Sequence, residues 1–224
     1  MNPVPNRLPV ADARPDLETL LENPRLWRGR GEGRSWRTVP SGHARLDGAL
    51  PGGGWPAGML TEIAVERYGS GEMALFMPLL ARLSGEGGGD ARRGWMVWVA
   101  PPYLPYAPAL AAAGVDPART LVVRAGSDAD ALWAAEQALL SGTCAIVLAW
   151  VARAGGRPLR RLQLAAERSG TPVVLFRPVR ALESPSPAAL RLKLASGHDG
   201  VRLHLVKHRG GAPVVLPFET LLSS

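Results

Sequence analysis

Cysteine and long apolar runs are what the 224-residue chain most clearly lacks. The single Cys144 excludes an internal disulfide, which fits a reducing compartment, and we expect it to be a small buried residue of an apolar strand. No apolar run reaches the roughly 18 residues that a membrane-spanning helix needs. The N-terminal residues also lack the apolar stretch of a secretory signal. These absences predict a cytoplasmic protein without membrane association.

Lysine is scarce as well, because Lys193 and Lys207 are the only lysines among 26 basic residues. Residues 1–149 carry 14 basic and 15 acidic side chains, a balance of −1, whereas residues 150–224 carry 12 and 4, a balance of +8. The last third of the chain therefore holds the whole positive excess. This asymmetry favours an anionic partner, nucleic acid first. GC-rich coding and an ordinary solvated surface are the alternative explanations of the arginines.

Histidine, with four residues in the chain, shows no metal-ligand spacing, and no other constellation of catalytic side chains accompanies it. His204 alternates with leucines in an expected strand and is best explained as a solvent-facing residue. We therefore expect neither a metal site nor catalytic residues.

The hydrophobic pattern after residue 38 alternates between strand and helix signals. Short apolar runs predict strands buried on both faces, and apolar residues at helical spacing predict the helices between them. Strict alternation near the C-terminus predicts strands with one solvent-facing side. Together these patterns predict an α/β fold with a mainly parallel sheet, flanking helices and antiparallel C-terminal strands. The expected strands are 60–65, 95–100, 120–123, 144–149, 172–176, 190–195, 201–206 and 214–218, and the expected helices are 72–83, kinked at Pro78, 104–113, 127–142 and 157–169.

Two parts of the chain differ in character, residues 1–37 and residues 38–224. The first part holds a leader, a short amphipathic helix expected at 16–26, and a Gly/Arg-rich tether, whereas the second is expected to be one core domain. The tether is a linker or a flexible nucleic-acid contact. A tethered helix can dock on another chain, so it is a candidate for partner binding. Its candidate residues are Leu17, Leu20, Leu21, Leu26 and Trp27.

Residues 60–75 predict a buried strand, a glycine-containing turn and a helix, which is the context of a phosphate-binding P-loop. Such a loop needs Gly-x-x-x-x-Gly-Lys-[Ser/Thr]. With Gly71 as the second glycine, the lysine position falls on Glu72 and the hydroxyl position on Met73. A carboxylate in place of the ammonium repels phosphate, so we expect no nucleotide cofactor. The degenerate positions of this loop are Glu66, Gly69, Gly71, Glu72 and Met73.

The segment 39–58 carries the most specific signal in the sequence. It reads Ser-Gly-x-x-x-Leu-Asp-x-Ala-Leu from Ser41 and Gly-Gly-Trp-Pro-x-Gly from Gly53, and it leads into a Thr-Glu-Ile strand. This series is similar to the lead-in of the RecA ATPase core, and the order of elements over about residues 38–220 also resembles RecA. The resemblance implies a RecA-like P-loop fold.

The resemblance also implies where catalysis would lie, and those positions are changed. RecA-type ATPases end a central strand with an aspartate that holds Mg²⁺, but here that strand ends at Ala149. The glutamate expected after the preceding strand is missing around Pro102, and the polar sensor after the next strand is replaced by Arg177. Together with Glu72, these changes imply that the protein is not an enzyme.

Two degenerate relatives of RecA share this pattern, the ImuA family and the SulA family. ImuA is the better match, because its members carry a leucine-rich N-terminal helix that runs into a Trp-Arg-Gly step, as residues 20–29 do here, and because SulA proteins are typically shorter. The resemblance implies a non-catalytic accessory role in SOS-induced mutagenic translesion DNA synthesis after DNA damage. The implied partners are the polymerase homologue ImuB, a DnaE-type error-prone polymerase and RecA.

The resemblance places the DNA-facing loops of RecA at 150–157 and 177–188 of this chain. Both loops lie in the basic last third, so we expect a single-stranded DNA contact and association with the nucleoid, with a solvated basic rim as the alternative. Lys207 and Arg209 fall where RecA has a basic pair near its subunit interface, which makes them candidate partner contacts. The candidate DNA-binding residues are Arg153, Arg157, Arg160, Arg161, Arg177 and Arg180.

Two other functions stay open at this point. One is a SulA-like inhibitor of cell division that binds FtsZ. The other is an active, ATP-dependent, recombinase-type protein that binds DNA. Pull-down with ImuB or FtsZ separates the first two readings, and micromolar binding of ATP with Mg²⁺ would establish the third.

Overall fold

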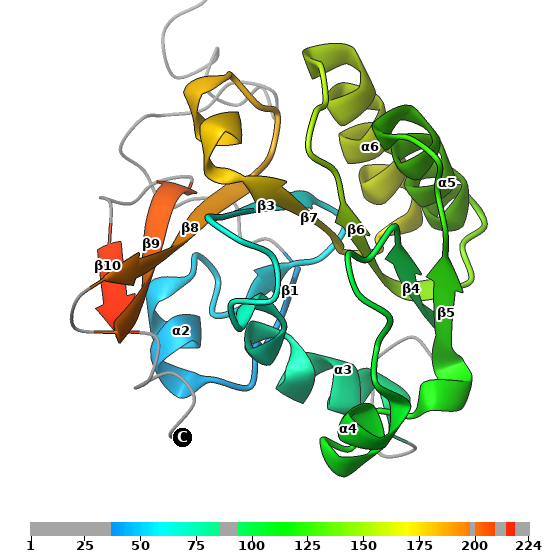
Figure 1. Ribbon diagram of the computed structural model, residues 1–224, viewed down its shortest axis with the longest axis horizontal. Helices are drawn as coiled ribbons and strands as arrows, with labels where there is room; N and C mark the ends of the chain where they lie inside the picture. Colours follow the sequence, from blue (N-terminus) through cyan, green and yellow to red (C-terminus); the bar gives the residue numbers. More distant parts are fainter. Residues whose placement is uncertain (1–36, 86–93, 198–199, 209–213, 218–224) are drawn as a thin grey trace, which may run out of the picture. The chain divides into compact units, whose positions relative to one another are not determined.

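The computed structural model of the chain describes residues 37–85, 94–197, 200–208 and 214–217 (Figure 1). The helix expected at 16–26 and nearly all of its tether lie outside the described residues, as does Arg209. The described residues all belong to one unit, Arg34–Ser224.

Strands and helices alternate along the described chain, as the hydrophobic pattern predicts. The strands are β1 (Thr38–Val39), β2 (Trp55–Pro56), β3 (Leu60–Val65), β4 (Trp95–Val99), β5 (Thr120–Val123), β6 (Cys144–Trp150), β7 (Val173–Pro178), β8 (Leu190–Gly197), β9 (Gly200–His208) and β10 (Val214–Pro217). The α-helices are α2 (Ala44–Ala49), α3 (Met77–Ser84), α4 (Ala107–Ala112), α5 (Asp128–Leu140) and α6 (Gly156–Ser169). Three short 3₁₀ helices are η1 (Glu72–Leu75), η2 (Pro117–Arg119) and η3 (Val179–Glu183).

The described strands form a large mixed sheet and a small ribbon. The sheet has eight strands in the order β10-β9-β8-β3-β7-β6-β4-β5. Neighbours from β8 to β5 run parallel, whereas β9 and β10 join the β8 edge antiparallel. The lead-in contributes the ribbon, an antiparallel pair of β1 and β2. The expected mainly parallel sheet with antiparallel C-terminal strands is therefore confirmed.

Apolar cores cover both faces of the large sheet. Under α2, α3 and α4 lie Ile146 and Leu148 of β6. Under α5 and α6 lie Val147 and Ala149, because successive side chains of a strand point to opposite faces. All seven residues of β6 are buried, which explains its uninterrupted apolar sequence. Cys144 at its start is buried, as predicted.

A row of aromatic rings crosses the core under α2, α3 and α4. Trp55 stacks on Phe76 with ring centroids 4.7 Å apart, and Phe76 meets Phe176 edge to face at 5.7 Å. Phe176 stacks on Trp150 at 4.7 Å, and Trp150 lies 5.7 Å from Trp98. Aromatic pairs at such separations contribute about 0.5–1.5 kcal/mol each beyond their burial. The row joins the lead-in to the strands β4, β6 and β7.

The helix expected at 72–83 is divided into η1 and α3. Pro78 lies in the first turn of α3, which begins at Met77. Proline lacks the amide hydrogen that an interior helical residue donates, but the first turn needs no donor there. The expected kink is therefore wrong, because Pro78 starts a helix. The helix expected at 104–113 shows the same effect, because α4 begins one residue before Pro108.

The start of β8 differs from the expected strand with one solvent-facing side. Leu190 and Leu192 enter the core as the alternation predicts, but Arg191 on the opposite side is only 6% exposed. The 3₁₀ helix η3 folds back over this side, and the Arg191 Nη2 donates to the carbonyl of Ala181 at 2.6 Å. The prediction fails here because it does not include η3.

The carboxyl ends of β3, β4, β6 and β7 meet at one edge of the sheet, because these strands are parallel. The connections that leave this edge are the turn 66–71, the segment 100–106, the loop 151–155 and η3. Ligands of open α/β sheets bind at such an edge. None of the helices in the described part of the chain has the length and apolar character that crossing a bilayer requires.

Candidate functional site

The turn 66–71 folds around the carboxylate of Glu72. Gly69 and Gly71 have φ angles of 81° and 99°, which side-chain-bearing residues rarely adopt. Glu72 is 2% exposed, and its Oε1 accepts a hydrogen bond from the Gly69 amide at 2.8 Å. Its Oε2 accepts no hydrogen bond from any described residue. The predicted buried strand and glycine turn are thus confirmed, and the residue at the lysine position folds back into the turn.

This geometry differs from that of a phosphate-binding loop in a specific way. Amides of such a loop point at the bound anion. Here the Gly69 amide points at a carboxylate of its own chain, so the donor is already used. The carboxylate also adds a negative charge that repels phosphate. The turn is therefore closed by an internal anion.

Tyr68 lies in the same turn and is partly buried. Burial raises the pKa of its hydroxyl, and the negative charge of Asp128 raises it further, while Arg177 and Arg180 act in the opposite direction. The phenol therefore stays neutral at physiological pH.

The other positions that the resemblance to RecA assigns to catalysis lie at the same edge of the sheet. Ala149 is fully buried inside β6 and is followed by the buried Trp150 and Val151, so no carboxylate ends this strand. Pro102 lies in the exposed segment after β4. Arg177, at the end of β7, has an environment that the sequence did not predict.

Arg177 belongs to a buried triad of charged side chains. Its Nη1 donates to Oε1 of Glu62 at 2.8 Å, and Nε of Arg191 donates to Oε2 of Glu62 at 2.7 Å. Glu62 is 2% exposed, and the two arginines are 5% and 6% exposed. Arg191 also donates to the carbonyls of Ala181 at 2.6 Å and Ser184 at 3.1 Å. The triad therefore links β3, β7 and β8 to η3.

The triad removes Arg177 from the candidate DNA contacts. A buried carboxylate costs several kcal/mol unless it is paired and hydrogen-bonded. Glu62, in an otherwise nearly apolar strand, holds both guanidinium groups inside the protein. Arg177 therefore has a structural role at a position where the resemblance implied a DNA-facing loop.

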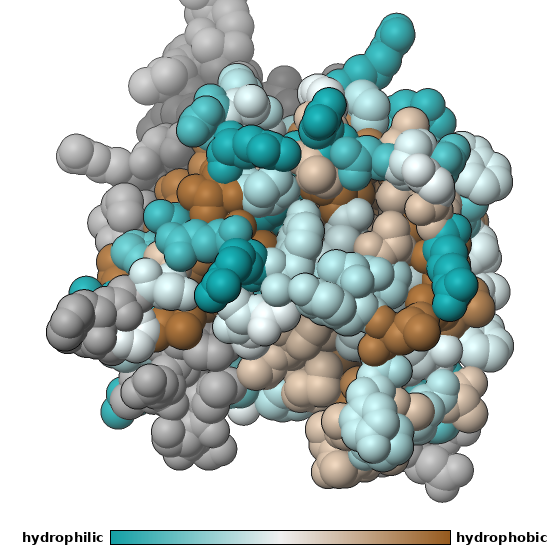
Figure 2. Space-filling model, viewed as in Figure 1, coloured by the Kyte–Doolittle hydropathy of each residue, from teal (hydrophilic) through white to brown (hydrophobic). Residues whose placement is uncertain are grey.

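The other candidate arginines lie on the surface. Figure 2 shows hydrophilic residues mainly over η3 and over the upper parts of α5 and α6, whereas tan and pale residues cover much of α3 and α4. Arg180 on η3 is exposed, as are Arg153 in the loop 151–155 and Arg157 and Arg160 at the start of α6. The exposed predicted arginines thus belong to the loop before α6, to α6 and to η3.

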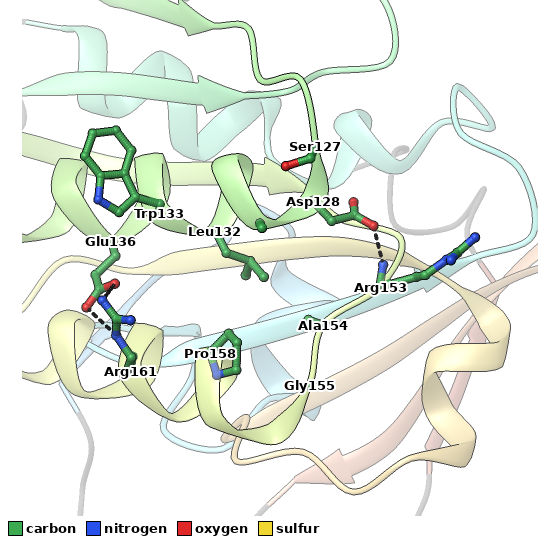
Figure 3. A pocket seen from close by; sticks show the side chains of 11 residues that line it. Ser127, Asp128, Leu132, Trp133, Glu136, Arg153, Ala154, Gly155, Pro158 and Arg161 are labelled. Atoms are coloured by element: carbon green, nitrogen blue, oxygen red, sulfur yellow. Dashed lines mark hydrogen bonds and ion pairs between the residues drawn. The ribbon is translucent and has the colours of Figure 1, made fainter.

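A groove of about 520 Å³ lies between α5 and α6 (Figure 3). Leu132 and Pro158 form part of its apolar lining, and Trp133 stands at its rim with 61% of its surface exposed. Arg161 makes a two-pronged ion pair with Glu136, with N–O distances of 3.2 and 2.7 Å. The groove therefore combines an aromatic face with a rim of charged residues.

Asp128 holds the other end of this groove. Its carboxylate accepts hydrogen bonds from the amides of Ala152 and Arg153, both at 2.9 Å, and so fixes the loop 151–155 to the start of α5. The guanidinium of Arg153 points away from Trp133, toward solvent (Figure 3). Arg161 offsets the charge of Glu136, whereas Asp128 is held by two uncharged amides and keeps its negative charge at this end of the groove.

Trp133 and Asp128 are two of several residues of this groove that are not among the predicted site residues. The buried stripe of α5 consists of Ala131, Leu132, Ala135 and Leu139. Trp133 falls outside this stripe, so a helical-wheel comparison could have placed it on the surface.

The candidate partner residues are described only in part. Lys207 lies exposed on β9, and its Nζ donates to the carbonyl of Ser186 at 2.9 Å. The five residues of the expected leader helix lie outside the described residues, as does Arg209. Their role in partner binding stays a prediction.

Comparison with known proteins gives two matches of different strength. No protein-family model matches the chain. Over 141 residues it is 36% identical to Protein ImuA of two Caulobacter vibrioides strains, with 61% of this chain and 56% of that protein covered. Over 124 residues it is 28% identical to the cell division inhibitor SulA of Edwardsiella piscicida, with 54% and 69% covered.

The identity and the covered length of each match decide how much it says about the family of the chain. The chain spans 56% of the length of the ImuA proteins that it matches. The higher identity and the longer alignment both fall on ImuA, as the leucine-rich leader and the length of the chain predict. The resemblance is confirmed, and the chain is an ImuA/SulA-like protein with greater similarity to ImuA.

Proposed function

We propose that the chain is a non-catalytic accessory protein of SOS-induced mutagenic translesion DNA synthesis. The observation that carries this proposal is the closed turn after β3, where the buried Glu72 takes the Gly69 amide at the lysine position of a nucleotide-binding loop. The similarity to ImuA supports the cellular role. A RecA-like fold without its nucleotide chemistry would then serve as a scaffold for other proteins.

The proposed partners are an ImuB-like polymerase homologue, a DnaE-type error-prone polymerase and RecA. The leucine-rich segment 16–27 and the exposed Lys207 are the proposed contacts of this scaffold. The groove between α5 and α6 and the arginines beside it are the proposed contact with single-stranded DNA. In this arrangement the protein joins the polymerase assembly to the damaged template without hydrolysing a nucleotide.

The proposal is tested by the mutation frequency after DNA damage. We expect deletion of the gene in its host to lower damage-induced mutation to the uninduced level, and expression of the chain to restore it. Equal mutation frequencies with and without the gene would contradict the cellular role. A calorimetric titration of the purified chain addresses the non-catalytic part, because micromolar affinity for ATP with Mg²⁺ would contradict it.

We expect Trp133→Ala to weaken binding of a single-stranded oligonucleotide about tenfold or more, because base stacking on an aromatic side chain contributes about 1–3 kcal/mol. Arg153→Ala with Arg157→Ala should weaken binding as well and should reduce the salt slope by roughly 1.4 if each arginine neutralises one phosphate. Fluorescence anisotropy at several salt concentrations measures both effects.

A charge-matched control for this experiment is Arg45→Ala with Arg168→Ala. Arg45 is exposed on α2, across the sheet from α5 and α6, and Arg168 is exposed in the last turn of α6. Both lie away from the groove and should change affinity little. Equal losses in the control and the groove variants, or no binding of the original chain at low salt, would contradict DNA contact at this groove.

A second candidate function is inhibition of cell division. The alignment with SulA covers 69% of that protein, a larger share than the 56% covered in ImuA. If this function holds, the purified chain should reduce the amount of FtsZ that sediments as polymer in the presence of GTP. We expect no such reduction for an accessory protein of translesion synthesis.

A further inference from the structure

A second groove, of about 330 Å³, lies beside the closed turn at the carboxyl ends of β4 and β6. Gly69 and Glu72 contribute to one side of it, and the segment 101–106 to the other. Trp98 and Trp150 line it from the strand ends, next to each other in the aromatic row. The groove therefore lies where a nucleotide-binding fold would hold its ligand.

The rim of this groove is aromatic, apolar and unusually exposed. Tyr103 and Leu104 are each 67% exposed, and Tyr106 is 70% exposed, all within one short segment. Prolines at 101, 102 and 105 restrict this segment, and the residue before them, Ala100, has a φ of 51°, which is unfavourable for a residue with a side chain. A strained, proline-restricted segment that displays large side chains to solvent is typical of a preformed contact surface.

Glu72 is the only residue of this groove's lining that carries a formal charge. One of its oxygens is held by the Gly69 amide, and the other has no hydrogen-bond partner among the described residues. No described lysine or arginine makes an ion pair with it. Because the carboxylate is buried, salt screens its charge less than that of a surface group. The groove is thus negative at its base and ringed by aromatic faces.

This combination selects a cation. Aromatic faces attract a cation, and a guanidinium stacks on them especially well. The same surroundings disfavour phosphate groups, because nothing in the lining offers a compensating positive charge. The indole N–H groups of Trp98 and Trp150 also lack partners in the described structure and could be satisfied by peptide carbonyls.

We infer that this groove binds an arginine side chain of a protein partner, presented between apolar residues of a peptide segment. The guanidinium lies against the tyrosine and tryptophan rings above Glu72, and the flanking apolar residues pack on Leu104 and the prolines. Tyr103 covers the turn, since a Cβ placed on Gly69 would lie 3.1 Å from its ring. Its exposed ring can rotate outward and open a path to the carboxylate.

This inference deepens the proposed function and rests on it in one respect, that the partner is a protein. At the place where a nucleotide-binding fold holds an anion, this groove would bind a cation. The closed turn then has two roles, because the same Glu72 that excludes nucleotide supplies the charge that recognises the partner.

The test uses a library of random seven-residue peptides displayed on phage and selected on the purified chain. Peptides that also bind the Glu72→Gln variant are removed. Glutamine keeps the oxygen that accepts from the Gly69 amide and removes only the charge, so the turn should keep its shape. We expect the selected peptides to contain an arginine or lysine with apolar neighbours.

Synthetic versions of the selected peptides are then measured by fluorescence anisotropy. Replacement of arginine by the uncharged citrulline should weaken binding to the original chain at least tenfold, and Glu72→Gln should weaken binding of the arginine peptide by a similar factor. Tyr106→Ala should weaken binding of both the arginine and the citrulline peptide. Glu66→Gln, which removes an exposed charge from the turn 66–71, should change the binding of neither.

The inference is overturned if no peptide is enriched, if the enriched peptides lack a basic residue, or if citrulline binds as well as arginine. Peptide binding is measured with the purified chain and does not depend on mutagenesis in the cell. A chain that binds the peptides but does not restore damage-induced mutation would contradict the proposed function, but it would support the inference about the groove.

Discussion

Glu62→Gln should lower the free energy of unfolding by about 3–5 kcal/mol, because it leaves two buried guanidinium groups without a counter-charge. The carboxylate bridges Arg177 and Arg191 at 2.8 and 2.7 Å in surroundings that solvent does not reach. Domains of this kind are stable by about 5–15 kcal/mol in total, so the loss removes a large share. Urea unfolding followed by far-ultraviolet circular dichroism measures it.

The matched control for this prediction is Glu66→Gln, just beyond the end of β3. Glu66 is exposed, so the same chemical change should alter the unfolding free energy by no more than about 0.5 kcal/mol. A loss below about 1 kcal/mol for Glu62→Gln would show that water or a rearranged loop compensates the arginines.

A triple variant, Glu62→Leu with Arg177→Met and Arg191→Met, tests the physical reason. Replacing all the members of a buried ionic group by apolar residues is often neutral or stabilising. The carbonyls of Ala181 and Ser184 lose their donor in this variant, so full recovery is not expected. The triple variant should nevertheless be more stable than Glu62→Gln.

Phe176→Ala should cost about 3–5 kcal/mol of unfolding free energy, the range for deleting a buried phenylalanine side chain. Phe176 is fully buried and lies at the centre of the aromatic row, stacked on Trp150 and edge to face with Phe76. Phe176→Leu keeps most of the volume and should cost less than Phe176→Ala. Unfolding is again followed by circular dichroism. Tryptophan fluorescence is less suitable, because the substitution itself changes the surroundings of the tryptophans.

Coupling within the aromatic row separates stacking from simple burial. The losses for Phe76→Ala and Phe176→Ala should not add in the double variant, with a coupling of about 0.5–3 kcal/mol for residues in contact. Tyr106→Ala is the control, because this ring is 70% exposed and lies outside the row. Strict additivity of the two phenylalanine losses would contradict a cooperative row.

The parallel sheet could be predicted because the local sequence of each strand is enough to identify it. β4 and β6 are short, uninterrupted apolar runs, and such runs are typical of strands covered on both faces. A kink at Pro78 was expected because the spacing of apolar residues alone cannot distinguish the interior of one helix from the start of another. The preference of proline for the first turn of a helix could have distinguished the two cases.

The candidate site was less predictable because its contacts join distant parts of the sequence. Arg177 and Arg191 lie 115 and 129 positions from Glu62, and no local pattern connects them. A usable signal was present, since β3 and β7 are nearly apolar strands that each carry one charged residue, and such charges must be compensated when buried. The resemblance to RecA worked against this signal, because it assigned Arg177 to a DNA-facing loop.

The position of β3 between β7 and β8 has a consequence for the synthesis of the protein. β3 leaves the ribosome long before either of its sheet neighbours, and the arginines that compensate Glu62 follow 115 and 129 residues later. At about 5–20 residues per second this delay is roughly 6–26 s. During that time both edges of an apolar strand are open to pairing with other chains. We therefore expect a chain cut short before β8 to aggregate, because one edge of β3 then has no partner strand.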